Sequence, residues 1–168
     1  MEEPRDTPDV KAEFKKLKTL MKILVKGMPK VKVGILGQTN QRNEGELTNA
    51  EIGFANEFGK MTGKVKVHAR SFIRMPLNLF LQEKIKQKKS LSKEAFEKAV
   101  ESGDLEQFAA KVGLVAEEVI QEAFATHGYG MWEPNAPYTI EKKKSDSPLI
   151  DTGQLRRAIT SKVIKDDN

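Results

Sequence analysis

Hydrophobic and polar residues alternate along the chain with two periods, and each change of period marks an expected element. Apolar residues at spacings of three and four predict an amphipathic helix over residues 10–24, which should end at Gly27 and Pro29. Alternation of apolar and polar residues over 30–35 then predicts a strand with one buried face. A shorter strand with the same pattern is expected at 64–67, after a turn at Gly63.

Caps and glycines delimit the helices expected in the middle of the chain. Thr48 and Glu51 have the spacing of a capping box, which predicts a short helix as far as Gly59. The inward face of this helix is expected to carry Ile52, Ala55 and Phe58. Further helical stretches are predicted over 71–85, 92–103 and 104–126.

The connecting and C-terminal segments are richer in turn residues. The polar, glycine-bounded segment 37–46 predicts an exposed, mobile loop. Glycine, proline and aromatic residues over 129–138 predict an irregular crossing. A helical turn at 139–143, a final helix capped by Asp151 or Thr152, and a strand over 161–164 complete the chain.

These elements predict an α+β fold in which three or four helices pack around a small, mostly antiparallel sheet. Residues 1–8 carry two prolines and four charges without periodicity, so they are expected to form a flexible leader before a single globular domain over 9–168. A length of 168 residues, with 38% hydrophobic and 32% charged residues, suits one globular domain and argues against general disorder or a membrane bundle. The chain shows no apolar run of bilayer length and no signal peptide, which favours a cytoplasmic site of synthesis and no membrane partner.

Residues that carry out catalysis are scarce. The chain has no cysteine and only two histidines, His68 and His127, which argues against thiolate chemistry and multi-histidine metal sites. Carboxylates at Glu118 and Glu122 lie four residues apart on the expected long helix, where a solvated helix face is the ordinary explanation. Phosphate-binding and hydrolase motifs are missing from the sequence. We therefore expect a protein without enzymatic activity, metal or cofactor.

Charge is distributed unevenly along the sequence. Residues 60–93 hold ten Lys or Arg against one Glu, a balance of +9, whereas residues 94–133 hold nine acidic residues against two Lys, a balance of −7. Such polarity suits docking of unlike faces between subunits or steering onto nucleic acid, and a solvated surface explains it equally well. The candidate contacts to DNA or to a neighbouring ring are Arg42, Lys86, Lys88, Lys89, Lys142, Lys143 and Lys144. Because aromatic residues do not interleave these cations, a small nucleic-acid-binding protein is the alternative rather than the first hypothesis.

Three stretches, 51–59, 69–76 and 132–160, together resemble the tailed-bacteriophage virion morphogenesis family, the tail-completion and neck proteins that join head to tail. The most specific stretch is Pro-Leu-Ile-Asp-Thr-Gly-Gln-Leu-Arg over 148–156, which follows a tryptophan and a lysine-rich turn. The resemblance covers roughly residues 31–164 and implies a structural virion protein in a ring around the DNA channel. It implies as partners other copies of the chain, connector or head-completion proteins, and tail-terminator or tail-tube proteins, with DNA in the channel left open. The implied location is the tail or neck of the virion, and the host cytoplasm during assembly.

The same stretches supply candidate interface residues. Arginine beside aromatic residues is typical of interface anchors, although each of these positions also suits a core edge or a structural corner. The candidates are Arg70, Phe72, Arg74, Trp132, Asp151, Thr152, Gly153, Leu155 and Arg156.

Overall fold

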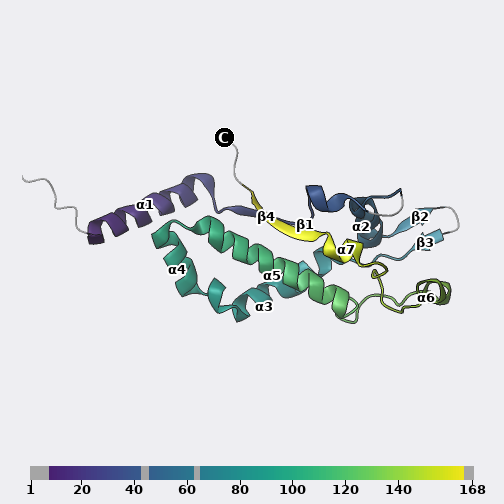
Figure 1. Ribbon diagram of the computed structural model, residues 1–168. Helices are drawn as coiled ribbons and strands as arrows, with labels where there is room; N and C mark the ends of the chain where they lie inside the picture. Colours follow the sequence, from purple (N-terminus) through teal and green to yellow (C-terminus); the bar gives the residue numbers. More distant parts are fainter. Residues whose placement is uncertain (1–7, 43–45, 63–64, 165–168) are drawn as a thin grey trace, which may run out of the picture.

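The computed structural model describes residues 8–42, 46–62 and 65–164, and the α+β class is confirmed (Figure 1). The expected leader falls almost wholly outside the described residues, apart from Pro8, which begins the first helix. The elements in chain order are α1 (Pro8–Lys26), β1 (Lys30–Ile35), a 3-10 helix (Gly37–Asn40), α2 (Asn49–Phe58), β2 (Lys60–Thr62), β3 (Val65–Val67), α3 (Arg74–Gln87), a second 3-10 helix (Lys89–Leu91), α4 (Lys93–Ser102), α5 (Leu105–Ala125), α6 (Pro137–Lys143), α7 (Gln154–Arg157) and β4 (Ile159–Ile164).

The main sheet joins the two ends of the described chain. Strands β1 and β4 pair antiparallel, with Lys30 opposite Ile164 and Ile35 opposite Ile159. Strands β2 and β3 form a separate antiparallel hairpin, of which only β3 was expected. Figure 1 shows α5 running alongside the β1–β4 pair, with α1 projecting at one end of an elongated molecule and α6 and the β2–β3 hairpin at the other. None of the helices in the described segments is long and apolar enough to cross a membrane.

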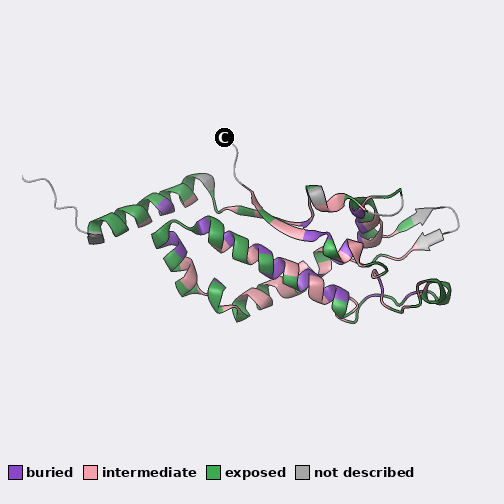
Figure 2. Cartoon of the chain, in the orientation of Figure 1, coloured by how far each residue is buried: buried purple, intermediate pink, exposed green. Residues whose placement is uncertain are grey.

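The hydrophobic core lies between α5, the start of α3 and the β1–β4 pair. Its buried residues come from α5, α7, β4, the segment before α3 and the C-terminal crossing, and Figure 2 shows the buried positions along α5 in purple. They are Phe72, Ile120, Ala123, Phe124, Trp132, Leu155 and Ile159. A smaller cluster of Ala99, Val100 and Leu105 joins α4 to α5. Because both clusters share α5, this helix is the central support of the fold.

Several caps differ from the sequence-based expectation. The capping box of Thr48 and Glu51 and the Ser92 cap are present. The cap expected at Asp104 makes no side-chain bond, and α7 starts at Gly153 in the left-handed region (φ 74°) rather than at a cap by Asp151 or Thr152. Glycine adopts this conformation without steric cost, so the tight turn selects glycine instead of a side-chain cap.

The segment 37–46 was expected to be an exposed, mobile loop, but its described residues before position 43 are bonded to α2. Asn49, only 2% exposed, donates from Nδ2 to the carbonyl oxygens of Thr39 (2.8 Å) and Gln41 (3.2 Å). Arg42 donates to Asn49 Oδ1 at 2.9 Å. These bonds fix the 3-10 turn against α2. The polar composition of the segment did not predict this contact.

The close approach of α5 to the sheet depends on Gly113. A Cβ placed there would lie 2.6 Å from Ser161 Oγ, 3.0 Å from Ser161 Cβ and 3.1 Å from Val31 Cγ1. Since Ser161 Cβ is fixed to the backbone of β4, the strand itself would have to shift. At Gly113 the helix backbone therefore lies directly against the sheet, whereas further along α5 the contact is made by side chains of the core cluster.

Substitution of Gly113→Val should lower the free energy of unfolding by about 2 kcal/mol, because overpacking pushes α5 away from β1 and β4. Urea unfolding followed by far-UV circular dichroism measures the change. Leu114→Val is the matched control, since Leu114 is 61% exposed on the same helix. Equal stability of Gly113→Val and the parent chain would contradict this view of the helix–sheet contact.

Candidate functional site

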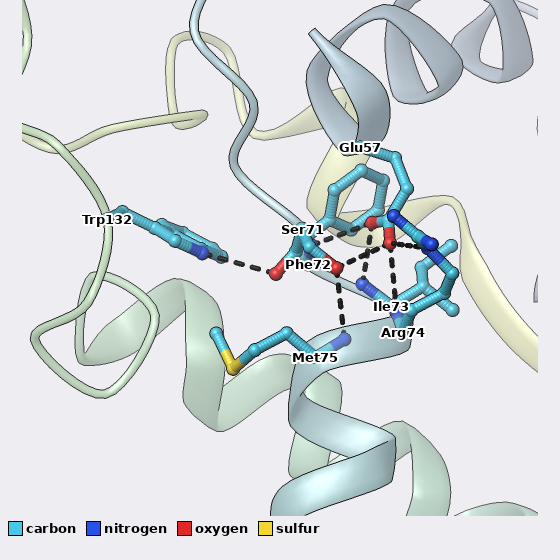
Figure 3. A network of polar contacts seen from close by, with 7 residues as sticks. All are labelled: Glu57, Ser71, Phe72, Ile73, Arg74, Met75 and Trp132. Atoms are coloured by element: carbon cyan, nitrogen blue, oxygen red, sulfur yellow. Dashed lines mark hydrogen bonds and ion pairs between the residues drawn. The ribbon is translucent and has the colours of Figure 1, made fainter.

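The three sequence stretches named above meet around one buried carboxylate, that of Glu57 (Figure 3). Glu57 is the last acidic residue of α2 and is 5% exposed. It accepts five hydrogen bonds: from Ser71 Oγ (2.6 Å), from the backbone N–H groups of Phe72 (2.8 Å), Ile73 (3.0 Å) and Arg74 (3.1 Å), and from Arg74 Nε (3.1 Å).

This carboxylate shares the capping of α3 with Ser71. The residue before α3 is Ile73, which has no polar side chain to bind the free N–H groups of the first turn. Glu57 accepts from the N–H groups of Phe72 and Ile73, just before the helix, and of Arg74, its first residue. Ser71 Oγ accepts from the N–H group of Met75 at 2.9 Å. The negative charge of Glu57 also meets the positive end of the α3 dipole. Burial raises the pKa of Glu57, but the hydrogen bonds from Ser71 and from the three N–H groups outweigh that effect and hold the pKa below 4.5.

The segment after Arg70 also holds the C-terminal crossing. Arg70 donates from Nε to the Glu133 carbonyl oxygen and from an Nη atom to the Pro134 carbonyl oxygen, both at 2.9 Å. Trp132 donates from Nε1 to the Ser71 carbonyl oxygen at 3.2 Å, and its ring packs edge-on against Phe124. The irregular crossing is therefore fixed by side chains rather than by regular secondary structure.

On the outside of this junction lies an exposed aromatic and cationic patch, which we call the α2–α3 surface and define as Phe54, Phe58 and Arg74. The rings of Phe54 and Phe58 lie 4.8 Å apart, and the Arg74 guanidinium carbon lies 4.4 Å from the centre of the Phe58 ring. Phe54 is 68% exposed and Phe58 is 50% exposed. The same Arg74 donates inward to Glu57, so the patch has a rigid backing.

Sequence reasoning placed this surface only in part. Arg74 was an interface candidate and is exposed, but Phe58 was expected to face inward, and Phe54 was missed. The residues that α2 buries are Asn49, Gly53 and Glu57, each four residues from the next. These three residues form the buried face of the helix, so Phe54 and Phe58 remain in solvent, while Ile52 packs half-buried against the core as expected.

Other interface candidates serve the interior of the chain, which corrects the expectation that they form a contact surface. Phe72, Trp132 and Leu155 are buried in the core cluster, and Arg70 is 9% exposed. Apolar and planar side chains are favoured both in a protein core and at an interface, so their spacing in the sequence does not show which of the two they occupy. They are therefore structural residues in this chain.

Some interface candidates in the turn between the C-terminal crossing and β4 are exposed to solvent. Asp151 and Thr152 are exposed, and Gly153 supplies the left-handed turn before α7. Arg156 donates from Nε to Gln121 Oε1 at 2.7 Å, while Gln121 donates back to the Arg156 carbonyl oxygen at 2.9 Å. This reciprocal pair ties α7 to α5.

The basic run at the end of α3 is partly neutralised within the chain. Lys84 lies 2.8 Å from a carboxylate oxygen of Glu122, and Lys88 lies 2.7 Å from one of Glu118. Hydrogen bonding to Glu122 raises the pKa of Lys84, and hydrogen bonding to Lys88 lowers the pKa of Glu118. The two carboxylates considered for a solvated helix face therefore bind Lys84 and the DNA candidate Lys88.

The remaining cationic candidates do not share one element. Lys86 is exposed in the last turn of α3, 3.8 Å from Glu83, and Lys89 is exposed just after the helix. Lys142 and Lys144 are exposed on and just after α6. Lys143 donates to the Ser147 carbonyl oxygen at 3.0 Å. Figure 1 places α6 well away from the end of α3. Arg42 is the third separate location, bound to Asn49.

The two histidines lie in separate parts of the fold. His68 lies beside the carboxylate of Glu133, and His127 takes a left-handed backbone conformation in the turns after α5. Burial, together with the charge of Glu122, raises the pKa of Tyr129 to about 12, and its hydroxyl donates to the Val119 carbonyl oxygen. Within the described segments, no group of three or more His, Cys, Asp or Glu residues could hold a metal ion.

Comparison with known proteins gives no relative: no family model, no curated protein and no solved structure matches the chain.

The Glu57 network should give the fold a measurable acid dependence. Substitution of Glu57→Gln should lower the free energy of unfolding at neutral pH by about 2 kcal/mol, because the amide presents a donor to groups that are themselves donors. The folded pKa lies below 4.5, so the contribution of this carboxylate is complete above that pH and is lost as the pH falls through the folded value. The difference between the two proteins should therefore narrow in acid.

Urea unfolding at a series of pH values measures this difference, with the exposed Glu141→Gln as the matched control. A constant gap between parent and Glu57→Gln from neutral pH down to strongly acidic pH would contradict the assigned role.

Proposed function

We propose that the chain is a non-enzymatic structural protein of a phage neck, which completes or joins the tail to the head as part of a ring around the DNA channel. The observation that carries the proposal is the α2–α3 surface, because two phenylalanine rings are held in solvent beside an arginine by an internally bonded framework. Exposed aromatic residues and arginine are the side chains that dominate protein–protein binding energy.

The resemblance of the sequence to the virion morphogenesis family supplies the kind of partner. The stretches that carry this resemblance, 51–59, 69–76 and 132–160, contain both the α2–α3 surface and the residues that fix it. A surface backed by Glu57 keeps its shape on binding, which favours docking of preformed subunits. The proposed partners are other copies of the chain, a connector or head-completion protein, and a tail-terminator or tail-tube protein.

The nucleic-acid-binding alternative receives less support. Duplex binding by counterion release needs several cations free to contact phosphates on one side of the molecule. Here Lys84 and Lys88 are engaged by α5 carboxylates, and the other candidates lie on separate elements. Docking between proteins does not require a continuous basic surface, so the neck role is the stronger proposal.

Immunogold electron microscopy of particles from the source lysate, with an antibody to this chain, tests the location. The expected result is label at the junction of head and tail. Label at the far tip of the tail would keep the chain in the virion but reject the neck role, and unlabelled intact particles would reject both.

Substitution of Phe54→Ser should impair head-to-tail joining while leaving the monomer folded, because Phe54 is mostly in solvent. Truncation of an interface hot spot costs about 2 kcal/mol or more, which is roughly 30-fold in affinity. Counting complete particles in lysates complemented with each variant measures the effect. The control is Leu114→Ser, an equally exposed apolar position on α5. Complementation by Phe54→Ser at the level of this control would show that the α2–α3 surface is not used.

A further inference from the structure

Helix α1 uses only one side to hold itself to the rest of the chain. Thr19, 7% exposed, and the half-buried Ile23 face α4, where Ile23 packs against the cluster of Ala99, Val100 and Leu105. Figure 2 shows the remainder of α1 as almost entirely exposed. The opposite side of α1 is therefore available to another molecule.

That opposite side is apolar and has a period of its own. Five exposed residues follow one another at spacings of four, three, four and three, which average 3.5 residues and form the seam of a coiled coil. Each is between 54% and 85% exposed: Val10, Phe14, Leu17, Met21 and Leu24. The next position of this repeat is Met28, just after the helix, at 38% exposed. Thr19 lies diametrically opposite the centre of the seam, so contact with α4 and contact through the seam are compatible.

We propose that α1 binds α1 of a second copy of this chain as a parallel, in-register coiled coil. With Val10, Leu17 and Leu24 at d positions and Phe14 and Met21 at a positions, the flanking residues can be paired across the interface.

The flanking charges decide in favour of a like, parallel partner. In a parallel pair each g residue faces the e residue five positions later on the other helix, which sets Glu13 opposite Lys18 twice by symmetry. Both are exposed, and neither has an ion pair within the described chain. The next such pair, Leu20 with Val25, is apolar and widens the seam. An antiparallel pair would instead bring e positions together, including Lys18 with Lys18.

The α2–α3 surface of a neighbouring copy is a less suitable partner for this seam. It carries the cation Arg74, whereas α1 is flanked by Lys11, Lys18 and Lys22. Like charges across a contact disfavour it. The pairing through α1 is also independent of the proposed neck role, because it uses the opposite end of the molecule (Figure 1).

An isolated helix of this length is marginal in water, but α1 is already held in place by α4. Pairing therefore does not have to order the helix, and a seam of less than three full heptads is sufficient. A two-fold contact of this type is closed, so it adds one partner and does not polymerise.

Cysteine crosslinking tests the geometry directly, because the chain has no native cysteine. In the full-length protein, Val10→Cys and Leu24→Cys should each form a disulfide-linked dimer on mild oxidation, since a parallel pair brings like d positions together. Ala12→Cys is the control, because residue 12 is exposed but points away from the seam. Crosslinking only in a mixture of Val10→Cys and Leu24→Cys would mean an antiparallel pair and would overturn the proposal, as would efficient crosslinking between Val10→Cys and Phe54→Cys.

Charge exchange provides a test without cysteines. Glu13→Lys and Lys18→Glu should each weaken dimerisation about ten-fold in sedimentation experiments, and the double exchange should restore it. Lys22 lies outside the seam, so adding Lys22→Glu to Glu13→Lys should not restore dimerisation. A parent chain that sediments as a monomer at its highest soluble concentration would overturn the proposal. Helicity measured in parallel by circular dichroism shows that each variant remains folded, and labelling of virions at the neck is unaffected by either result.

Discussion

The bonding of one buried carboxylate, Glu57, to the start of α3 organises the half of the molecule that carries the candidate surface. Without this carboxylate, the N–H groups of Phe72, Ile73 and Arg74 would face the interior without acceptors. Glu57 binds all three, and in doing so fixes the distance between α2 and α3. Phe72 then enters the core, while Arg74 and the two rings of α2 stay outside. The bonds to Glu57 thus determine which residues of the segment 72–74 are buried and which are exposed.

Local patterns in the sequence predicted where helices and strands form better than they predicted which residues those elements contact. The α+β class, the capping box at Thr48, the Ser92 cap and the long α5 were predictable, because each depends on residues within a few positions of one another. The pairing of β1 with β4 and the binding of α3 by Glu57 join residues far apart in the sequence. No local spacing encodes such contacts. The burial of Phe72 and Trp132 was ambiguous for the same reason, since an aromatic residue beside arginine suits both a core edge and an interface.

Charge illustrates how folding changes the meaning of a sequence pattern. The basic segment 60–93 and the acidic segment 94–133 suggest two surfaces of opposite sign when counted along the chain. In the fold α3 lies against α5, and Lys84 and Lys88 meet Glu118 and Glu122. Part of the polarity is therefore used to hold two helices together. Exposed pairs of this kind contribute little to stability individually, but they remove charges that would otherwise be free to attract a nucleic acid.

The apolar residues of α1 show why amphipathicity alone does not identify a buried face. A stripe of period near 3.6 is expected to face the protein's own core, and the segment 10–24 was consistent with that. The fold places Thr19 and Ile23, not the stripe, against α4, so the domain is held by the other side of this helix. Two properties of the sequence support the proposed partner. The spacing of the stripe averages 3.5 residues, and the charges beside it are complementary to a parallel copy of themselves. An apolar helix face that the fold leaves in solvent, with flanks that match its own sequence, is what self-association requires.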